Sequence, residues 1–218
     1  MLLFNIFDDT QVNNIRTAIS KVSFTDGKLT AQGEAKLVKN NQQITHSSSK
    51  EAKQLPLNLE RELVKNPTFR NYTHFRLFAD TMINKYGPGE TYGWHYDNHL
   101  IKAQRTDISF TLFLTDPKSY EGGELELKYQ QSTKIVKGNP GQILIYPTGV
   151  LHRVNPVTKG ERISMVGWIQ SWVKNFEDRE MLNLMQSQIQ EIKGKIPAEN
   201  TQKLRQALQY FFRSVSSS

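Results

Sequence analysis

Two histidines and an aspartate occupy every second position in residues 92–99, which read Y-G-W-H-Y-D-N-H. Side chains two residues apart on a β-strand point to the same face, so an extended segment here would project His95 and Asp97 together. A neutral imidazole and a carboxylate are two of the three ligands of the 2-His-1-carboxylate triad, which binds non-haem Fe(II) and leaves coordination positions open. The segment therefore predicts part of an iron site, which needs a second histidine.

The chain contains five histidines, and their surroundings separate the candidates for that ligand. His46 lies in a polar segment and His74 follows a helix-like segment, so both are expected to be structural or solvated. His99 has suitable spacing, but three ligands along one straight strand would span about 13 Å between the outer Cα atoms. Ligand bonds are only ~2 Å long. We therefore expect His99 to lie beside the pocket and not on the ion.

His152 has the surroundings expected of the missing ligand. It follows an apolar strand, residues 143–147, and a threonine-glycine turn, and it begins another strand. A hairpin centred near Val157 would place His152 opposite Arg162, because cross-strand neighbours approach within about 5 Å. A guanidinium binds a carboxylate through two parallel hydrogen bonds. We expect 2-oxoglutarate to chelate the iron through its keto oxygen and near carboxylate, while Arg162 holds the far carboxylate.

The bulk composition limits the class of protein. The chain has 218 residues, of which 37% are hydrophobic, and no cysteine, so disulfides, zinc-thiolate sites and thiol nucleophiles are excluded. The net charge of +7 comes from scattered Lys and Arg, which favours an anionic small molecule or solubility over nucleic acid. The N-terminus resembles a strand more than a signal peptide, and no apolar run approaches the roughly 20 residues of a membrane span. We expect a cytoplasmic protein.

The elements that must position these residues fall into three regions. Residues 1–73 predict an N-terminal support region, with helices over 8–20 and 51–65 and a long ordered loop over the polar residues 30–49. The second helix carries Pro56 near its first turn, where proline is tolerated. Residues 74–173 form the β core, and residues 174–218 return to a helical pattern.

Short segments rich in β-branched and aromatic residues, separated by turn residues, define that core. They predict strands over residues 75–78, 82–86, 108–114, 124–129, 134–137, 142–146, 151–154 and 162–172. Many short strands at close spacing favour a barrel or a double-sheet jelly roll. The fold class we predict is therefore α+β, with N-terminal helices and a C-terminal helical tail around a jelly-roll core.

The sequence also resembles the Fe(II)/2-oxoglutarate dioxygenases, and within them the PKHD-type hydroxylases, a prolyl-4-hydroxylase-like branch. The resemblance extends over nearly the whole chain and is carried by residues 38–43 (VKNNQQ), 86–97, 105–107, 111–114, 120–125 (YEGGEL), 151–152, 156–158, 160, 162 and 168–171 (WIQS). It implies a double-stranded β-helix core of the cupin type, with His95, Asp97 and His152 as iron ligands and Arg162 as the anchor of 2-oxoglutarate.

Further expectations come from the resemblance alone. Ascorbate would keep the iron reduced, and Tyr86 matches a tyrosine that lines the co-substrate pocket in prolyl-hydroxylase-like relatives. Phe113 stands where some of those relatives have a second tyrosine, so the remaining partners of the far carboxylate differ. The reaction implied is hydroxylation of a substrate by O2 and 2-oxoglutarate, with release of succinate and CO2.

The primary substrate is not evident from the sequence. A peptidyl or prolyl-like group, or a small molecule related to iron acquisition, fits the resemblance. Two alternatives remain: a nucleic-acid dealkylase of the same superfamily, which the basic charge would favour, and a non-catalytic sensor of iron or 2-oxoglutarate. The Met/Leu face of the C-terminal helices predicts either core packing or a homo-oligomer interface.

Overall fold

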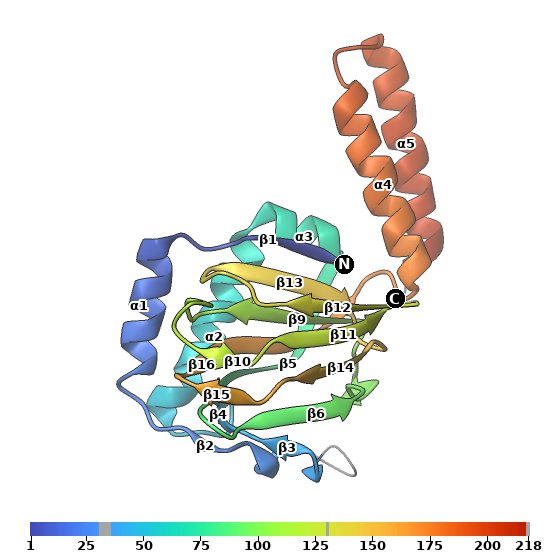
Figure 1. The fold of residues 1–218 in the computed structure, drawn as a ribbon. Helices are drawn as coiled ribbons and strands as arrows, with labels where there is room; N and C mark the ends of the chain where they lie inside the picture. Colours follow the sequence, from blue (N-terminus) through green and yellow to red (C-terminus); the bar gives the residue numbers. More distant parts are fainter. Residues whose placement is uncertain (31–35, 130, 217–218) are drawn as a thin grey trace.

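Two antiparallel β-sheets facing each other form the centre of the computed structural model, which describes residues 1–30, 36–129 and 131–216 (Figure 1). The larger sheet has the order β1 (Leu2–Asn5), β13 (Gln142–Pro147), β9 (Ile108–Phe113), β16 (Arg162–Ser171), β5 (Phe75–Tyr86), β4 (Gln42–Thr45) and β2 (Thr25–Asp26). The smaller sheet has the order β12 (Ser132–Val136), β11 (Leu125–Tyr129), β14 (Leu151–Val154), β6 (Thr91–His95) and β3 (Lys39–Asn40).

Among the described residues, two short strand pairs and five α-helices complete the fold. The pairs are β10 (Glu121–Gly122) with β15 (Val157–Lys159) and β7 (Leu100–Ile101) with β8 (Gln104–Arg105). The helices are α1 (Asp9–Ile19), α2 (Lys50–Lys65), α3 (Pro67–Thr73), α4 (Phe176–Ile192) and α5 (Ala198–Val215), with a 3₁₀ turn at Gly27–Leu29. The α+β class and the jelly-roll core predicted from the sequence are confirmed.

The core divides into two clusters because β9 is buried on both faces. Ile108 and Leu112 pack in the cluster between the larger sheet and the N-terminal helices, together with Phe69 of α3. Phe113 packs in the cluster between the two sheets. Side chains alternate along a strand, and Ser109 and Thr111 accordingly face the second sheet, where they line a cavity. The space between the sheets is therefore where a site can form.

The second predicted helix is confirmed as α2, but Pro56 does not lie near its first turn as predicted. Ser49 is the N-cap, with its side chain accepting from the Ala52 backbone N–H, so Pro56 lies inside the helix and beyond the first turn. Proline there removes one helical hydrogen bond. The helix tolerates it because Pro56 is buried in the same face as Leu59 and Leu63.

The long loop predicted over residues 30–49 is wrong where that segment forms two strands. Residues 31–35 lie outside the described residues, but residues 39–40 and 42–45 form β3 and β4, which add a strand to each sheet. Two further predicted strands, 75–78 and 82–86, are one continuous strand, β5. The prediction failed because Ala79 and Asp80 interrupt the apolar pattern, whereas the pairing with β16 continues past them through a register shift at Ala79. The division into three regions remains a prediction.

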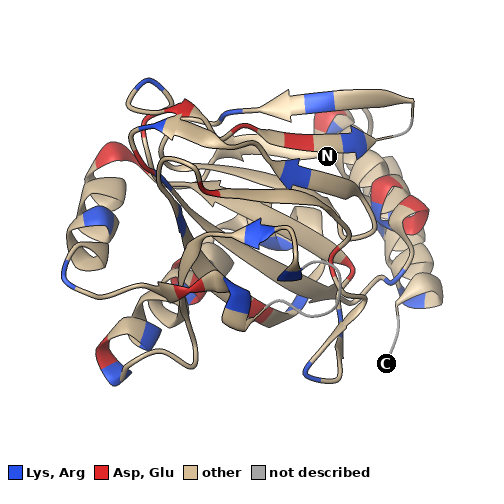
Figure 2. Ribbon diagram, turned by 60° about the horizontal axis from the view of Figure 1, so that its bottom comes forward, with Lys and Arg blue, Asp and Glu red and all other residues tan. Residues whose placement is uncertain are grey.

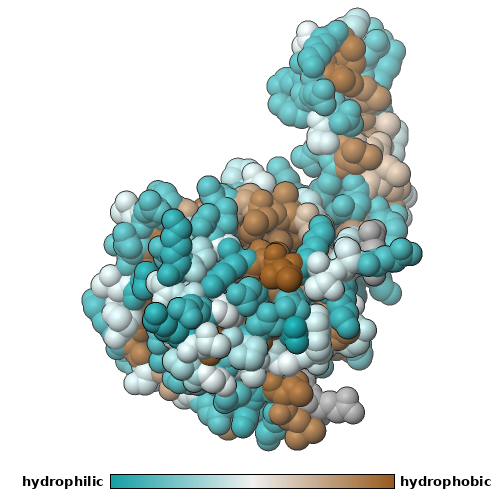
Figure 3. Space-filling model, viewed as in Figure 1, coloured by the Kyte–Doolittle hydropathy of each residue, from teal (hydrophilic) through white to brown (hydrophobic). Residues whose placement is uncertain are grey.

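Helices α4 and α5 pack against each other and project from the sheets (Figure 1). Apolar residues lie exposed along this hairpin, as Figure 3 shows; they include Met181, Leu184, Leu204 and Tyr210. Within the described ranges, no helix is long and apolar enough to cross a membrane. Lys and Arg are interspersed with Asp and Glu over the strands and helices (Figure 2), so the positive charge is distributed and not gathered on one element.

Candidate active site

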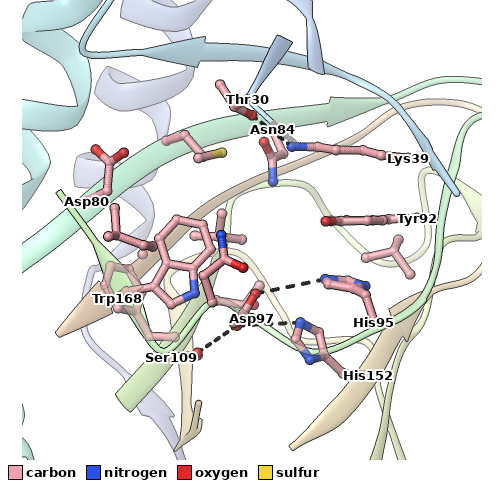
Figure 4. Close-up of a pocket in the computed structure, with 18 of the residues that line it drawn as sticks. Thr30, Lys39, Asp80, Asn84, Tyr92, His95, Asp97, Ser109, His152 and Trp168 are labelled. Atoms are coloured by element: carbon pink, nitrogen blue, oxygen red, sulfur yellow. Dashed lines mark hydrogen bonds and ion pairs between the residues drawn. The ribbon is translucent and has the colours of Figure 1, made fainter. Parts of the chain in front are cut away.

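Three side chains from the smaller sheet converge on one point. His95 ends β6 and lies opposite His152 of β14 in the strand register, and Asp97 follows two residues after His95. Their ligand atoms all lie within 4.8 Å of one another. Asp97 Oδ1 is 3.9 Å from His95 Nε2, and Asp97 Oδ2 is 3.7 Å from His152 Nε2 (Figure 4). The structure thus brings together the three residues expected from the sequence.

Both imidazoles are oriented in the same way by the backbone. His95 Nδ1 lies 2.7 Å from the carbonyl oxygen of Gly93, and His152 Nδ1 lies 2.8 Å from that of Val150. A carbonyl oxygen only accepts, so each Nδ1 carries the proton and each Nε2 keeps a lone pair. Hydrogen bonds of this kind fix metal-binding histidines in their tautomer and ring orientation. Both Nε2 atoms are therefore ready to coordinate.

The electrostatics of the site favour neutral imidazole. Burial, and then the neighbouring His152, lower the pKa of His95 to about 4, against the opposing effect of Asp97. The ring of Tyr92 stacks on that of His95 with 3.5 Å between ring centroids. A neutral, desolvated imidazole beside a carboxylate is the donor set that suits Fe(II) in a triad with open positions. The residues present therefore fit the metal.

Asp97 is held in place from the larger sheet. Ser109 Oγ on β9 donates to Asp97 Oδ2 at 2.7 Å and lies 3.1 Å from Thr148 Oγ1. One carboxylate oxygen is thus hydrogen-bonded, and Oδ1 faces His95. This contact ties the ligand set to the opposite sheet, and the serine was not recognised as a site residue from the sequence.

Replacing Ser109 by alanine should weaken Fe(II) binding by roughly 10- to 100-fold, the usual effect of removing a hydrogen bond that orients a metal ligand. The fold should persist, because the substitution removes one oxygen from a strand paired on both sides. Ser119→Ala is the matched control, since its hydroxyl donates to the backbone oxygen of Asp116 in an exposed turn. Equal Fe(II) affinities of both variants and the parent, measured by anaerobic titration, would contradict this role.

Arg162 reaches the site by a different route from the one predicted. The hairpin that was to place it opposite His152 is wrong: Arg162 on β16 pairs with Tyr86 on β5, while His152 pairs with Leu127 and His95. The two strands lie in different sheets, because β15 between them pairs with β10 and not with β14. Arg162 and His152 nevertheless line the same cavity, since the two sheets face each other.

The guanidinium of Arg162 is buried without a counter-charge. Its side chain is 2% exposed, its Nη1 donates to Ser164 Oγ at 2.8 Å, and its Nε has no partner. It lies over the rings of Tyr86 and Phe113, at 5.4 and 5.8 Å from their centroids. Among the described residues, no carboxylate lies within 4.0 Å of it. Burying an unpaired cation is costly, so the environment fits a ligand carboxylate.

Tyr86 lies beside this arginine, fully buried on the neighbouring strand. Burial raises the pKa of its phenol to about 12, although the charge of Arg162 opposes the shift. The phenol therefore stays neutral and able to donate. Phe113, by contrast, offers only its ring, which agrees with the expected departure from relatives that have a second tyrosine there.

A cavity of about 330 Å³ joins these groups (Figure 4). Of the residues around the metal-binding motif, Tyr96 and Asn98 line the cavity, whereas Trp94 and His99 do not. Trp94 faces away from the metal site, between Lys128 and Arg153. Tyr96 lines the cavity although it follows His95 directly, because β6 ends at His95 and the strand alternation ends with it. His99 is exposed, and its place beside the pocket stays a prediction.

Several lining residues were not singled out from the sequence: Lys39, Asn84, Tyr92, Tyr146 and Trp168. A signal existed for Asn84, which lies two positions before Tyr86 and so on the same face of β5. Lys39 was visible only as part of the motif VKNNQQ. Burial raises the pKa of Tyr146, so its phenol also stays neutral beside His152, with 5.5 Å between the ring centroids.

Comparison with known proteins now defines the class. Residues 81–170 match the model of the 2OG-Fe(II) oxygenase superfamily, a range that contains every residue of the proposed iron and co-substrate site. The chain is 42% identical over 179 residues to a PKHD-type hydroxylase of Gloeothece citriformis, covering 81% of this chain and 80% of that one. It is 39% identical over 213 residues to a PKHD-type hydroxylase of Idiomarina loihiensis, covering 97% and 96%. The chain belongs to the PKHD-type hydroxylases.

Solved structures support the same fold at low sequence identity. A 2OG-Fe(II) oxygenase family oxidoreductase of Burkholderia pseudomallei superposes with a TM-score of 0.60 at 15% identity, covering 77% of this chain and 83% of that one. A prolyl-4-hydroxylase of Pseudomonas putida superposes with a TM-score of 0.55 at 18% identity, covering 78% and 91%. This chain is therefore an oxidoreductase of the 2OG-Fe(II) oxygenase class, and the predicted enzyme class is confirmed.

Proposed function

We propose that His95, Asp97 and His152 bind a single Fe(II) and that Arg162 holds the far carboxylate of 2-oxoglutarate in hydroxylation of a further substrate. The observation that carries the proposal is the convergence of two oriented Nε2 atoms and one carboxylate at a buried point. The unpaired guanidinium in the same cavity supports the second half. Family membership supports the metal and the co-substrate together.

Bound Fe(II) would supply the activation of O2 with which a C–H bond is hydroxylated while 2-oxoglutarate yields succinate and CO2. The chain's own residues would position the reactants. Arg162, with Tyr86 beside it, would orient the co-substrate through its far carboxylate, so that the opposite end reaches the metal. Ser109 would keep Asp97 in its ligating rotamer. The burial of the ligands limits access of water to the reacting groups.

The metal requirement gives a direct test of this function. Enzyme treated with a chelator should lose the release of succinate from labelled 2-oxoglutarate, and Fe(II) should restore it. Zn(II), which binds histidine and carboxylate without redox chemistry, should occupy the site and leave activity absent. Turnover that persists undiminished in metal-free enzyme would contradict the assignment.

The finer parts of the proposal rest on the resemblance and on composition. Ascorbate is proposed as the reductant that keeps the iron ferrous, and a cytoplasmic location fits a chain without cysteine. The primary substrate is proposed to be a peptide, a prolyl-like group or a small molecule connected with iron acquisition. Comparing metabolites and peptides that gain one oxygen in the presence of active enzyme would identify it. Nucleic acid is disfavoured by the dispersed positive charge.

A homo-oligomer formed through α4 and α5 also remains a prediction. Met181 and Leu184 on α4 and Leu204 and Tyr210 on α5 are exposed on the projecting hairpin. Exposed apolar residues on the helix pair of one copy can pack against the same residues of a second copy in a symmetric assembly. Sedimentation of the full chain measures the oligomeric state.

A further inference from the structure

Lys39 is a second buried cation of the cavity, distant in sequence from the metal-binding motif. It lies on β3, the edge strand of the smaller sheet, and is only 4% exposed. Its ammonium donates to Thr30 Oγ1 at 3.0 Å and to Gln43 Oε1 at 3.1 Å. Both acceptors are neutral, and within the described part of the chain no carboxylate comes within 4.0 Å of Lys39. An ammonium has three N–H bonds, so one remains for a ligand.

Asn84 meets Lys39 from the opposite sheet. Its side chain points into the cavity from β5 next to the end of Lys39, as Figure 4 shows, and is only 5% exposed. Its Nδ2 group carries two N–H donors for an anion, whereas its Oδ1, which is buried without a hydrogen-bond partner, is an acceptor and cannot itself bind one. The ring of Tyr92, with its centroid 5.3 Å from Lys39 Nζ, forms the wall beside them.

This corner is separate from the anchor proposed for 2-oxoglutarate. In the larger sheet Arg162 pairs with Tyr86, and Ser164 pairs with Asn84. Asn84 therefore lies two residues along β5 from the position opposite Arg162. This separation is about 7 Å. The co-substrate has two carboxylates, of which one belongs with the metal and the other with Arg162. The ammonium of Lys39, at a third place and without a carboxylate partner among the described residues, is therefore available to another anion.

We propose that Lys39 and Asn84 together bind a carboxylate of the primary substrate and thereby fix which of its carbons faces the metal. The inference rests on the proposed function, because it assumes that 2-oxoglutarate occupies the Arg162 side. One ammonium N–H and one amide N–H match the two oxygens of a monovalent carboxylate. A phosphate, with three oxygens and up to two charges, needs more donors than this corner offers.

The charge state of Lys39 is compatible with this role. Burial lowers the pKa of Lys39 to about 8, although Asp97 and Asp26 oppose the shift. At neutral pH the ammonium is therefore mostly protonated, and a bound carboxylate would favour that form further. A free acid is then recognised over its neutral amide or ester, because a neutral group leaves the buried cation unpaired.

The test uses the full-length protein with Mn(II) in place of Fe(II), saturating 2-oxoglutarate, and N-acetylglycine as the probe. Mn(II) does not turn over but relaxes nearby protons. The acetyl methyl signal of N-acetylglycine should show at least about fivefold more relaxation enhancement than that of N-acetylglycinamide, since charge-assisted hydrogen bonds are about twice as strong as neutral ones. Lys39→Met should abolish this difference, and the exposed control Lys28→Met should retain it. Binding of 2-oxoglutarate should be equal in all three proteins.

Two results would overturn the inference while leaving the proposed function intact. In the first, 2-oxoglutarate binds beside Mn(II) as expected, but N-acetylglycine is relaxed no more than N-acetylglycinamide. A preference for N-acetylglycine that persists in Lys39→Met would count in the same way. In the second, N-acetylglycine is relaxed only because it displaces 2-oxoglutarate from the metal. The Mn(II)-induced broadening of the 2-oxoglutarate signals would then decrease in parallel. Failure of 2-oxoglutarate to bind in every variant would instead contradict the proposed function on which the inference rests.

Stability provides a second readout that separates ligand recognition from structural support. The pKa of Lys39 falls on folding from 10.5 to about 8, so the folded state disfavours the charge. The charged ammonium therefore lowers the stability of the folded state below pH 8. This destabilisation diminishes as the pH rises from 8 to 10.5 and is absent above this range. Lys39→Met should therefore raise the thermal midpoint at pH 7 and flatten its rise between pH 8 and 10. A lowered midpoint at pH 7 would mark Lys39 as a structural residue and overturn the proposal.

Discussion

Replacing Asp97 by alanine should reduce succinate formation at least about 100-fold and weaken Fe(II) binding by a similar or larger factor. The expectation follows from its position between the two imidazoles, where its carboxylate supplies the only negative charge of the ligand set. Loss of a hydrogen bond behind a ligand already costs 10- to 100-fold, and loss of the ligand itself removes more. Anaerobic Fe(II) titration and assay of labelled succinate measure the two effects.

The control for this substitution is Asp9→Ala, an exposed aspartate in the first turn of α1. It removes the same group far from the cavity and should leave both measurements unchanged. Asp97→Ala should also keep its fold, because Ser109 still lies within reach of Thr148. Normal succinate formation by a folded Asp97→Ala protein would remove this residue from the metal site.

Arg162→Met should raise the dissociation constant of 2-oxoglutarate by roughly 30-fold to several thousandfold. Truncating one partner of a buried, hydrogen-bonded charge pair costs about 2–5 kcal/mol, which converts to that range. Methionine keeps an apolar chain to pack on Tyr86 and Phe113, so the fold should persist. Fe(II) affinity in the absence of co-substrate should be unaltered, because Arg162 is not placed on the metal.

Arg153→Met is the matched control. This arginine is on β14, next in sequence to His152, but its guanidinium pairs with Glu126 and stacks on Trp94, outside the cavity. Its loss should leave co-substrate affinity unchanged, since Arg153 does not line the cavity. If Arg162→Met lost Fe(II) but bound 2-oxoglutarate as the parent does, Arg162 would not be the anchor.

The convergence of His95, Asp97 and His152 could be predicted from the sequence because each side chain is positioned by its own neighbours. Asp97 follows His95 by two residues just past the end of β6, and His152 begins a strand after a clear turn, so each side chain is aimed by its own few neighbours. The backbone carbonyls that orient the rings lie two residues before each histidine, within β6 for His95 and just before β14 for His152. Arg162 was predicted as a co-substrate anchor because a guanidinium binds carboxylates, although the strand pairing assumed for it was wrong.

That error shows where local reasoning fails. Equal spacing around Val157 suggests a hairpin, but the segment after β14 crosses to the opposite sheet and pairs with β10 on its way. Pairing between sheets depends on distant strands, which a single stretch of sequence does not specify. Lys39 was missed for the same reason. Its strand has two residues, and its importance arises only where β3, β5 and β6 meet around the cavity.

A crystal grown without oxygen in the presence of Fe(II) and 2-oxoglutarate, measured at the iron absorption edge, tests the central claim most directly. The account predicts one anomalous peak at about 2 Å from His95 Nε2, His152 Nε2 and an oxygen of Asp97, with the far carboxylate of 2-oxoglutarate on the guanidinium of Arg162. A peak bound elsewhere, or Asp97 turned away from the ion, would contradict it.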